Sequence, residues 1–250
     1  MQDTKKLILD AIASNIFPGA VLSVSLKGEV VFHEAYGMAD IFSGSKMTVK
    51  TFFDLASLTK PLATTLALML LMQEGRISLD QPIIEILPGF EGSGKRKITI
   101  RHLLCHTSGM PDWRPWFFRL RRRPSAERKE LLHRLLTAEL LCSEPGSKTI
   151  YSDLGFMLLE WIIEEVSGDR LDRFVQQAVY KPLGITDLFY IDLWGEKQSN
   201  RSHLKFLRQL PTRLWRSEEN VKKTQFPTGP VDCSFPYDSI DVAACDGFRE

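Results

Sequence analysis

The order of apolar and polar residues divides the first third of the chain into a helix, a hairpin and a second helix. Residues 3–16 carry apolar side chains at helical spacing, and a Pro-Gly pair follows where this helix would stop. Residues 20–36 are two β-rich runs around Gly28, which predicts two antiparallel strands with that glycine in the turn. Residues 55–74 return to helical spacing, and Gly75 provides a stop signal.

The middle of the chain is mainly helical in pattern. Further helices are expected at 98–106, 125–142, 152–167 and 171–180, separated by turns that contain proline or glycine. After Ile191 the periodicity fades. One hairpin followed by several helices indicates an α+β protein. We therefore expect residues 1–250 to form a single domain, with the hairpin 20–36 in a sheet and a helical lobe over about 55–190.

Composition narrows the range of partners. The 250 residues are 44% hydrophobic, and 32 Lys and Arg residues nearly balance 31 Asp and Glu residues. A balanced charge gives no reason to expect nucleic acid as a partner, so a small-molecule substrate is favoured. Four cysteines lack the spacing of a metal site, and we expect neither metal nor cofactor. The N-terminal residues have no signal-peptide pattern, and the longest apolar run is too short to span a bilayer, so we expect a cytoplasmic protein without membrane contact.

The first chemical candidate is Ser57-Leu58-Thr59-Lys60, an S-x-x-K sequence at the start of a predicted helix. Three residues of separation place Ser57 and Lys60 on one helical face, where the ammonium nitrogen can reach the hydroxyl. Serine is a weak nucleophile and needs a neighbour that accepts its proton, and a lysine in a cleft can do so when its pKa is lowered. Taken alone, the pattern occurs by chance in many proteins and is more typical of an ordinary N-cap serine.

A second candidate is Tyr151-Ser152-Asp153, directly before the predicted helix that begins near Leu154. A tyrosine at such a junction could relay protons. The alternative is a half-buried tyrosine that only packs.

Three ordered segments resemble successive signatures of one family. They are Phe52–Pro61, Ile100–Pro111 and Pro145–Phe156. Their order and spacing resemble the β-lactamase-related serine hydrolases, which include class C β-lactamases, penicillin-binding proteins, D-alanyl-D-alanine carboxypeptidases and esterases. The resemblance runs from about residue 10 to 190. It implies a β-lactamase/transpeptidase-like fold, in which an antiparallel sheet flanked by helices accompanies a mainly helical lobe.

The resemblance also implies roles for the candidates. Ser57 would be acylated by an ester, amide or lactam carbonyl, Lys60 would accept its proton, and Tyr151 would exchange protons during acyl transfer. Asp153, a candidate substrate-binding residue, stands where many relatives carry Asn. A carboxylate there would bind Lys60 more strongly than an amide, raise the pKa of the lysine and weaken it as a base. With Asp in place of Asn at this position, a β-lactam is a less expected substrate.

One expected motif is absent from the sequence. Relatives carry a third motif, Lys-Thr-Gly or His-x-Gly, and residues 154–250 contain neither, since Lys223-Thr224 precedes Gln225 and His203 precedes Leu204. We therefore expect a C-terminally truncated domain that lacks the last strands of its sheet, with an open sheet edge that favours self-association. The functional expectation is a serine hydrolase acting through an acyl-enzyme on small esters or amides. The alternative is an inactive homologue that only binds a ligand or a partner chain.

Two other patterns invite interpretation as sites. Ser108, in His106-Thr107-Ser108-Gly109, could be a nucleophile beside a histidine, but the family pattern makes this segment a structural turn. Residues 89–95 nearly match a phosphate-binding loop, yet Arg96 replaces the required Ser or Thr, so a flexible surface loop is expected.

Overall fold

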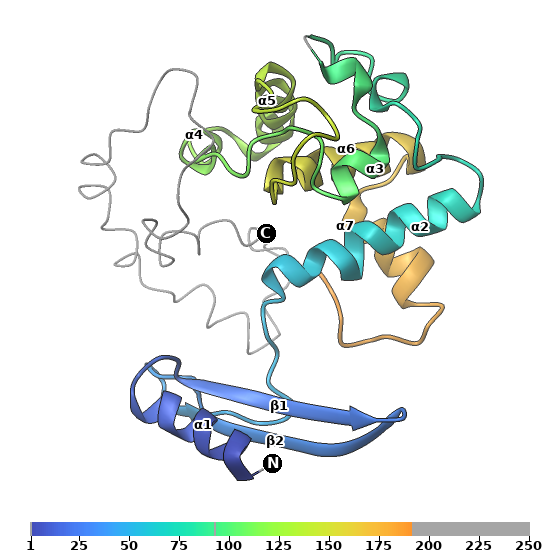
Figure 1. The fold of residues 1–250 in the computed structure, drawn as a ribbon. Helices are drawn as coiled ribbons and strands as arrows, with labels where there is room; N and C mark the ends of the chain where they lie inside the picture. The colour runs from blue at the N-terminus through green and yellow to red at the C-terminus, as the bar shows by residue number, and fades with distance from the viewer. Residues whose placement is uncertain (1, 93, 192–250) are drawn as a thin grey trace. The chain divides into compact units, whose positions relative to one another are not determined.

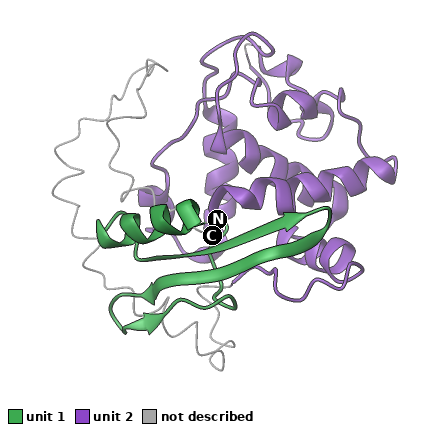
Figure 2. Cartoon of the chain, turned by 60° about the horizontal axis from the view of Figure 1, so that its bottom comes forward, with its two compact units in different colours: residues 1–55 green, residues 56–250 purple. Residues whose placement is uncertain are grey.

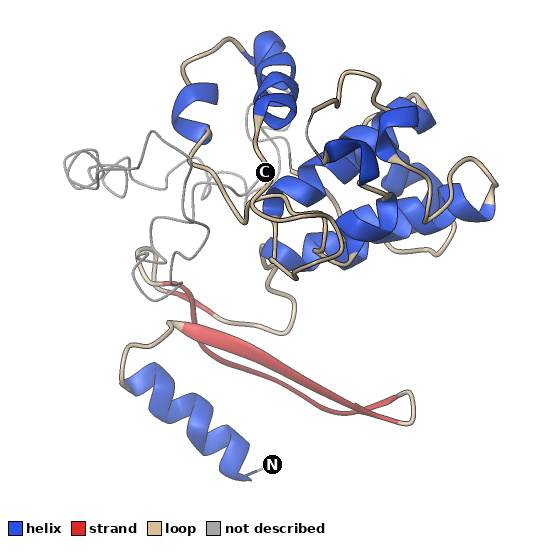
Figure 3. Ribbon diagram, turned by 45° about the horizontal axis from the view of Figure 1, so that its top comes forward, coloured by secondary structure: helices blue, strands red, loops and turns tan. Residues whose placement is uncertain are grey.

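The structure is a computed structural model that describes residues 2–92 and 94–191. Residues 1–55 and 56–250 form two compact units, coloured separately in Figure 2, and each is described by itself. The strands all belong to the first unit within the described residues, and the second unit is built from helices and loops (Figure 3).

The first unit contains helix α1 (Gln2–Ala13) and the strands β1 (Gly19–Leu26), β2 (Glu29–Asp40) and β3 (Ser45–Lys46). The strands form an antiparallel sheet in the order β1-β2-β3 (Figure 1). The predicted hairpin is confirmed: Gly28 lies in the turn with φ +86°, a conformation that glycine adopts without steric cost.

The second unit begins with a helical segment that is less regular than its sequence pattern predicts. Instead of one helix over 55–74, the chain forms a 3-10 turn η1 (Ala56–Leu58), a π-helical segment η2 (Lys60–Thr65) and helix α2 (Leu66–Gln73). Pro61 explains the interruption, since it has no N–H to donate and is tolerated only near a helix start.

The remaining elements of the second unit are short turns and helices. The 3-10 turns are η3 (Ile83–Glu85) and η4 (Lys95–Lys97), and η5 (Gln176–Tyr180) is π-helical. The α-helices are α3 (Ile100–Leu104), α4 (Phe117–Leu120), α5 (Ser125–Ala138), α6 (Asp153–Ser167) and α7 (Leu171–Val175). The predicted helices 98–106 and 125–142 are therefore real but shorter. The prediction for 171–180 is partly right, because α7 passes into the π-helical η5.

Helix α6 is the centre of the core of this unit. Five of its apolar residues are fully buried: Leu154, Leu158, Leu159, Ile162 and Ile163. They pack in one cluster with residues of α2, α3 and α7. Burying an aliphatic side chain of this size stabilises a fold by about 1.5–3 kcal/mol, so α6 has a fixed position. Its N-terminus, where the candidate residues lie, is fixed with it.

The segment 89–95 ends at a buried lysine. Lys95 is buried, with 5% of its surface exposed, and its Nζ donates to the carbonyl oxygen of Thr137 at the end of α5. The prediction of a flexible surface loop at 89–95 is therefore wrong for this residue, because its ammonium group anchors the segment.

No helix among the described residues is both long and apolar enough to cross a bilayer.

Candidate active site

Ser57 and Lys60 come together as the S-x-x-K spacing predicts. Ser57 lies in η1 and is exposed, and Lys60 begins η2. The Nζ atom of Lys60 lies 3.4 Å from the Oγ atom of Ser57. Ala56 precedes the serine with φ +44°, an uncommon conformation for a residue with a side chain. The chain therefore turns sharply just before the hydroxyl group.

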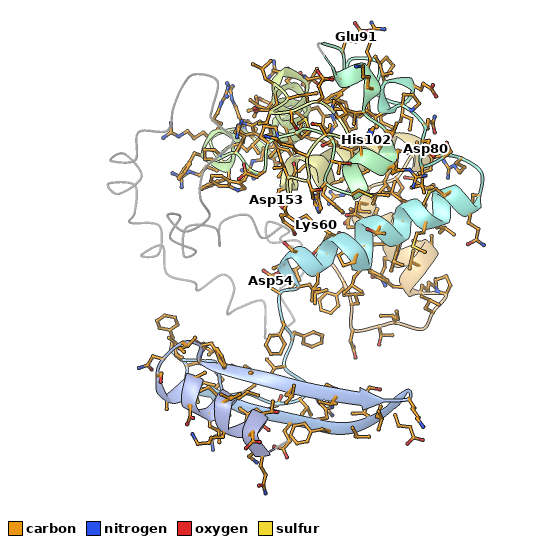
Figure 4. All side chains as sticks on the ribbon, viewed as in Figure 1. Asp54, Lys60, Asp80, Glu91, His102 and Asp153 are labelled. Atoms are coloured by element: carbon orange, nitrogen blue, oxygen red, sulfur yellow. The ribbon has the colours of Figure 1, made fainter. Side chains whose placement is uncertain are left out.

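Asp153 binds the same lysine from a distant part of the sequence. Its Oδ1 atom lies 2.6 Å from the Nζ atom of Lys60, and Figure 4 shows the two side chains adjacent at the start of α6. The side chain of Lys60 is 15% exposed and that of Asp153 is 35% exposed. This ion pair joins the first turn of α6 to the segment that carries Ser57.

The charge of Lys60 is set by two opposing effects. Burial lowers the pKa of its ammonium group, but the hydrogen bond and the charge of Asp153, with a smaller contribution from Tyr151, outweigh burial and raise the pKa above 10.5. At neutral pH the lysine is therefore an ammonium ion. This agrees with the expectation that a carboxylate at position 153 weakens Lys60 as a base.

Tyr151 contacts the same lysine through its ring. The Nζ atom of Lys60 lies 4.9 Å from the centre of the Tyr151 ring and 5.5 Å from that of Phe156, within the range of cation–π attraction. Of the surface of Tyr151, 43% is exposed. The tyrosine is therefore next to the Ser57–Lys60 pair and accessible from solvent.

The start of α6 is held by hydrogen bonds to the segment that follows α3. Ser152 is the N-cap: its Oγ accepts from the N–H of Gly155 at 3.0 Å and donates to the carbonyl oxygen of Pro111. The backbone N–H of Asp153 donates to the carbonyl oxygen of Asp112 at 2.8 Å. These bonds satisfy groups that a helix start leaves unpaired, and they fix the direction in which Asp153 leaves the backbone.

His106 is also a member of this site, although the sequence suggested it only as a neighbour of Ser108 and as part of a turn. Its Nδ1 atom accepts from the backbone N–H of Ser152 at 3.0 Å, and its ring lies 4.4 Å from that of Tyr151. Burial lowers the pKa of His106, the charge of Lys60 lowers it further, and Asp153 opposes this in part. The four residues Lys60, His106, Tyr151 and Asp153 thus form one cluster beside Ser57.

Ser108 does not join this cluster as a nucleophile. It is 1% exposed, and its Oγ accepts from the N–H of Met110 at 3.2 Å. The interpretation of this segment as a structural turn agrees with that placement.

The part of the chain that the structure describes has no set of side chains that could hold a metal ion. Residues 2–92 and 94–191 contain no group of three or more His, Cys, Asp or Glu side chains arranged to hold an ion.

Comparison with known proteins identifies the family. A family model described as Beta-lactamase matches residues 5–205, more than half of the chain. The chain belongs to the β-lactamase family. The recognition made from the three sequence signatures is confirmed, and so is the α+β fold class.

Individual relatives show what kinds of protein this chain is similar to. It is 36% identical over 191 residues to a protein named N-acetylmuramyl-L-alanine amidase from Bacillus subtilis strain 168, with 70% of this chain and 43% of the relative aligned. It is also 36% identical over 188 residues to a predicted D-alanyl-D-alanine carboxypeptidase of Escherichia coli K12, with 68% and 42% aligned. A solved class C β-lactamase matches with a TM-score of 0.62 at 24% identity, with 73% of this chain and 48% of that chain covered, and this likeness shows the fold alone.

The chain spans less than half of the length of these two curated relatives. The sequence comes nearest to a third motif at Lys223 and His203, and both lie outside the described residues.

Proposed function

We propose that this chain carries the nucleophile of a serine hydrolase that works through an acyl-enzyme. The observation that supports this most directly is the 3.4 Å contact between the Oγ atom of Ser57 and the Nζ atom of Lys60, next to an exposed tyrosine. A hydroxyl, an amine and a phenol within one cluster are the groups that nucleophilic catalysis and proton transfer require.

In the proposed reaction the Oγ atom of Ser57 attacks a carbonyl carbon, and a new ester bond forms. The C–N or C–O bond to the leaving group breaks, and the leaving group takes a proton from Tyr151 or Lys60. A water molecule then attacks the ester, which releases the acid and returns the proton to Ser57. The backbone N–H of Ser57 would donate to the developing oxyanion.

Activation of Ser57 depends on the proton of Lys60. Because Asp153, 2.6 Å away, holds the lysine as an ammonium ion, Lys60 has to lose a proton to solvent before it can accept one from Ser57. This transfer is uphill, since the pKa of the lysine is raised. We therefore expect slow acylation at neutral pH and faster acylation as the pH rises.

The proposed substrates are small amides and esters. The two relatives are named for the cleavage of amide bonds, at a muramyl-alanine link and at a D-alanyl-D-alanine link. These names support an amide or ester of an amino acid more than a β-lactam.

A second candidate is an inactive homologue that binds a ligand without turnover. It is supported by the ion pair with Asp153, which keeps Lys60 charged and so opposes its action as a base.

The test is covalent labelling with a fluorophosphonate, followed by intact mass and peptide mapping. The proposal expects one adduct on Ser57, which Ser57→Ala abolishes and Ser108→Ala retains. A folded parent chain that gains no adduct, or one whose adduct survives Ser57→Ala, would refute a serine hydrolase built on this residue. In that case the ligand-binding candidate would be tested next, by the thermal shift that D-alanyl-D-alanine produces.

Self-association through the sheet is also proposed. Within the described residues β1 is hydrogen-bonded to β2 only, so one edge of this eight-residue strand is unpaired there. An unpaired strand edge can bind the same edge of a second copy. Sedimentation of the parent chain as a monomer at micromolar concentration would contradict this proposal.

A further inference from the structure

The backbone at His106 suggests that its side chain has a specific task. Helix α3 ends at Leu104, and His106 follows in the left-handed conformation with φ +57°. Its N–H donates to the carbonyl oxygen of Leu103 at 3.1 Å, as in a helix C-terminus. Glycine is the usual residue at such a position, since any side chain there adds strain. An imidazole at a position that favours glycine points to contacts that offset this cost.

His106 makes hydrogen bonds to the backbone on both sides of Tyr151 in the sequence. The Nδ1 atom of His106 accepts from the N–H of Ser152 at 3.0 Å, and its carbonyl oxygen accepts from the N–H of Ile150 at 2.8 Å. One residue therefore binds the backbone immediately before and immediately after the tyrosine. The imidazole ring also lies 4.4 Å from the Tyr151 ring and 5.2 Å from the Phe156 ring. The phenol is fixed in position by backbone and ring contacts together.

The bond to Ser152 requires a neutral imidazole. A neutral ring has one nitrogen that accepts and one that donates, so acceptance at Nδ1 leaves the proton on Nε2. The charged and titratable groups around the ring are Lys60 from η2 and Tyr151 and Asp153 at the start of α6. Burial first, and then the Lys60 ammonium, lower the pKa of His106 below its ordinary 6.5, while Asp153 acts in the opposite direction. Protonation in acid would place two N–H groups face to face and break this bond.

We propose that His106 is a positioning residue that holds Tyr151 against Lys60, and that its protonation releases the tyrosine. This inference rests on the proposed serine hydrolase, because it concerns the geometry of that site. His106 is not assigned as the base: its accepting nitrogen already holds the N–H of Ser152. It acts through Tyr151, and its effect is expected in both the rate of acylation and its dependence on pH.

The chain offers a matched set of variants. His106→Asn keeps a side-chain acceptor near the place of Nδ1 and tolerates the left-handed conformation, whereas His106→Gly tolerates the same conformation but has no acceptor and no ring. His133→Asn is the control. His133 is also a half-buried histidine, stacked on Trp161 at 3.7 Å between α5 and α6, and burial lowers its pKa too, yet it does not belong to the cluster.

The first measurement is the rate of fluorophosphonate labelling at Ser57 between pH 5 and 8, with circular dichroism to confirm folding. We expect His106→Gly to label about 10- to 100-fold more slowly, since small misplacements of catalytic groups cost rate factors of this size. The rate of every protein should fall toward acid, because Lys60 stays protonated, and the parent should show an additional acid limb as the pH falls through the lowered pKa of His106. His106→Asn should retain the neutral-pH rate within a few-fold and lose this additional acid limb. His133→Asn should match the parent at every pH. Parent-like labelling by folded His106→Gly, or an unchanged acid limb in His106→Asn, would overturn the inference.

The second measurement does not depend on activity. The ring signals of Tyr151 are followed by NMR through the same pH range, and they should shift with the protonation of His106 in the parent and not in His106→Asn. If the parent gains no adduct on Ser57, the proposed function fails while this titration still decides the positioning role. Tyr151 signals that ignore the titration of His106 would refute that role.

Discussion

Replacing Asp153 by Asn removes the carboxylate that holds Lys60 as an ammonium ion, while leaving an amide oxygen that can still accept from it. The charge of Asp153 favours the ammonium form of Lys60, and a hydrogen bond to a charged group contributes about 1.5–3 kcal/mol. Since the side chain of Asp153 is 35% exposed, solvent screening places this contribution near the lower end, on the order of 1–2 kcal/mol. Because about 1.4 kcal/mol corresponds to a factor of ten in an equilibrium constant, losing it gives on the order of tenfold more neutral amine at a given pH.

The expected result is about tenfold faster labelling of Ser57 in Asp153→Asn at pH 7 to 9. Labelling rates are measured with a fluorophosphonate across this range, and the rate of each protein should rise with pH, the variant being displaced to lower pH. Unfolding in urea is measured alongside, because the variant also loses a carboxylate in the first turn of α6, which costs about 0.3–1 kcal/mol.

The matched control is Asp172→Asn. Asp172 also lies in the first turn of a helix, α7, and is paired with an arginine, Arg170, at 2.9 Å. It should lose a similar amount of stability and label at the parent rate. Equal or slower labelling by folded Asp153→Asn would refute the argument that Asp153 restrains Lys60, and would indicate that the carboxylate assists the proton transfer.

Three further results are expected. Ser152→Ala should lower the free energy of unfolding by about 1–2 kcal/mol, because the buried hydroxyl bonds two backbone groups at the start of α6; a loss under 0.5 kcal/mol would contradict that role. Gly109→Ala should lower the free energy of unfolding in urea far more than Gly168→Ala. Both glycines have positive φ, but a Cβ at Gly109 would lie 2.1 Å from a carbonyl oxygen, whereas one at Gly168 would meet nothing within 4 Å. With Asp153 ionised, the stability contributed by the Lys60–Asp153 pair should be complete below pH 10.5 and be lost as the pH rises through the raised pKa of the lysine, so the melting temperatures of the parent and of Asp153→Asn should converge in strong alkali.

Local patterns in the sequence predicted the local structure well. The β-rich runs around Gly28 formed the hairpin, and the apolar spacing of 152–167 formed α6 almost to the residue. The helix over 55–74 was predicted less well, because a periodic pattern does not reveal that Pro61 interrupts regular hydrogen bonding. Helix ends were also misplaced at 98–106, where the backbone turns at His106.

The candidate site also combines contacts that the sequence predicted with contacts that it did not. The contact between Ser57 and Lys60 follows from three residues of separation, which any helical turn brings together. The partnership of Lys60 with Asp153 joins residues 93 positions apart, and only the family resemblance suggested it before the structure was known. His106 was considered for its neighbour Ser108 and not for its contact with Ser152, 46 positions away.

The sequence by itself determined the elements, the family and the identity of the reactive groups, because hydrophobic periodicity, turn residues and short motifs act over a few neighbouring positions. Only the tertiary structure decided the charge of Lys60 and the role of His106. Both depend on which side chains the packing of α6 against α2 and α3 brings within hydrogen-bond distance, and on how much water that packing excludes. Electrostatic effects of this kind follow from distance and burial, which a linear sequence does not record.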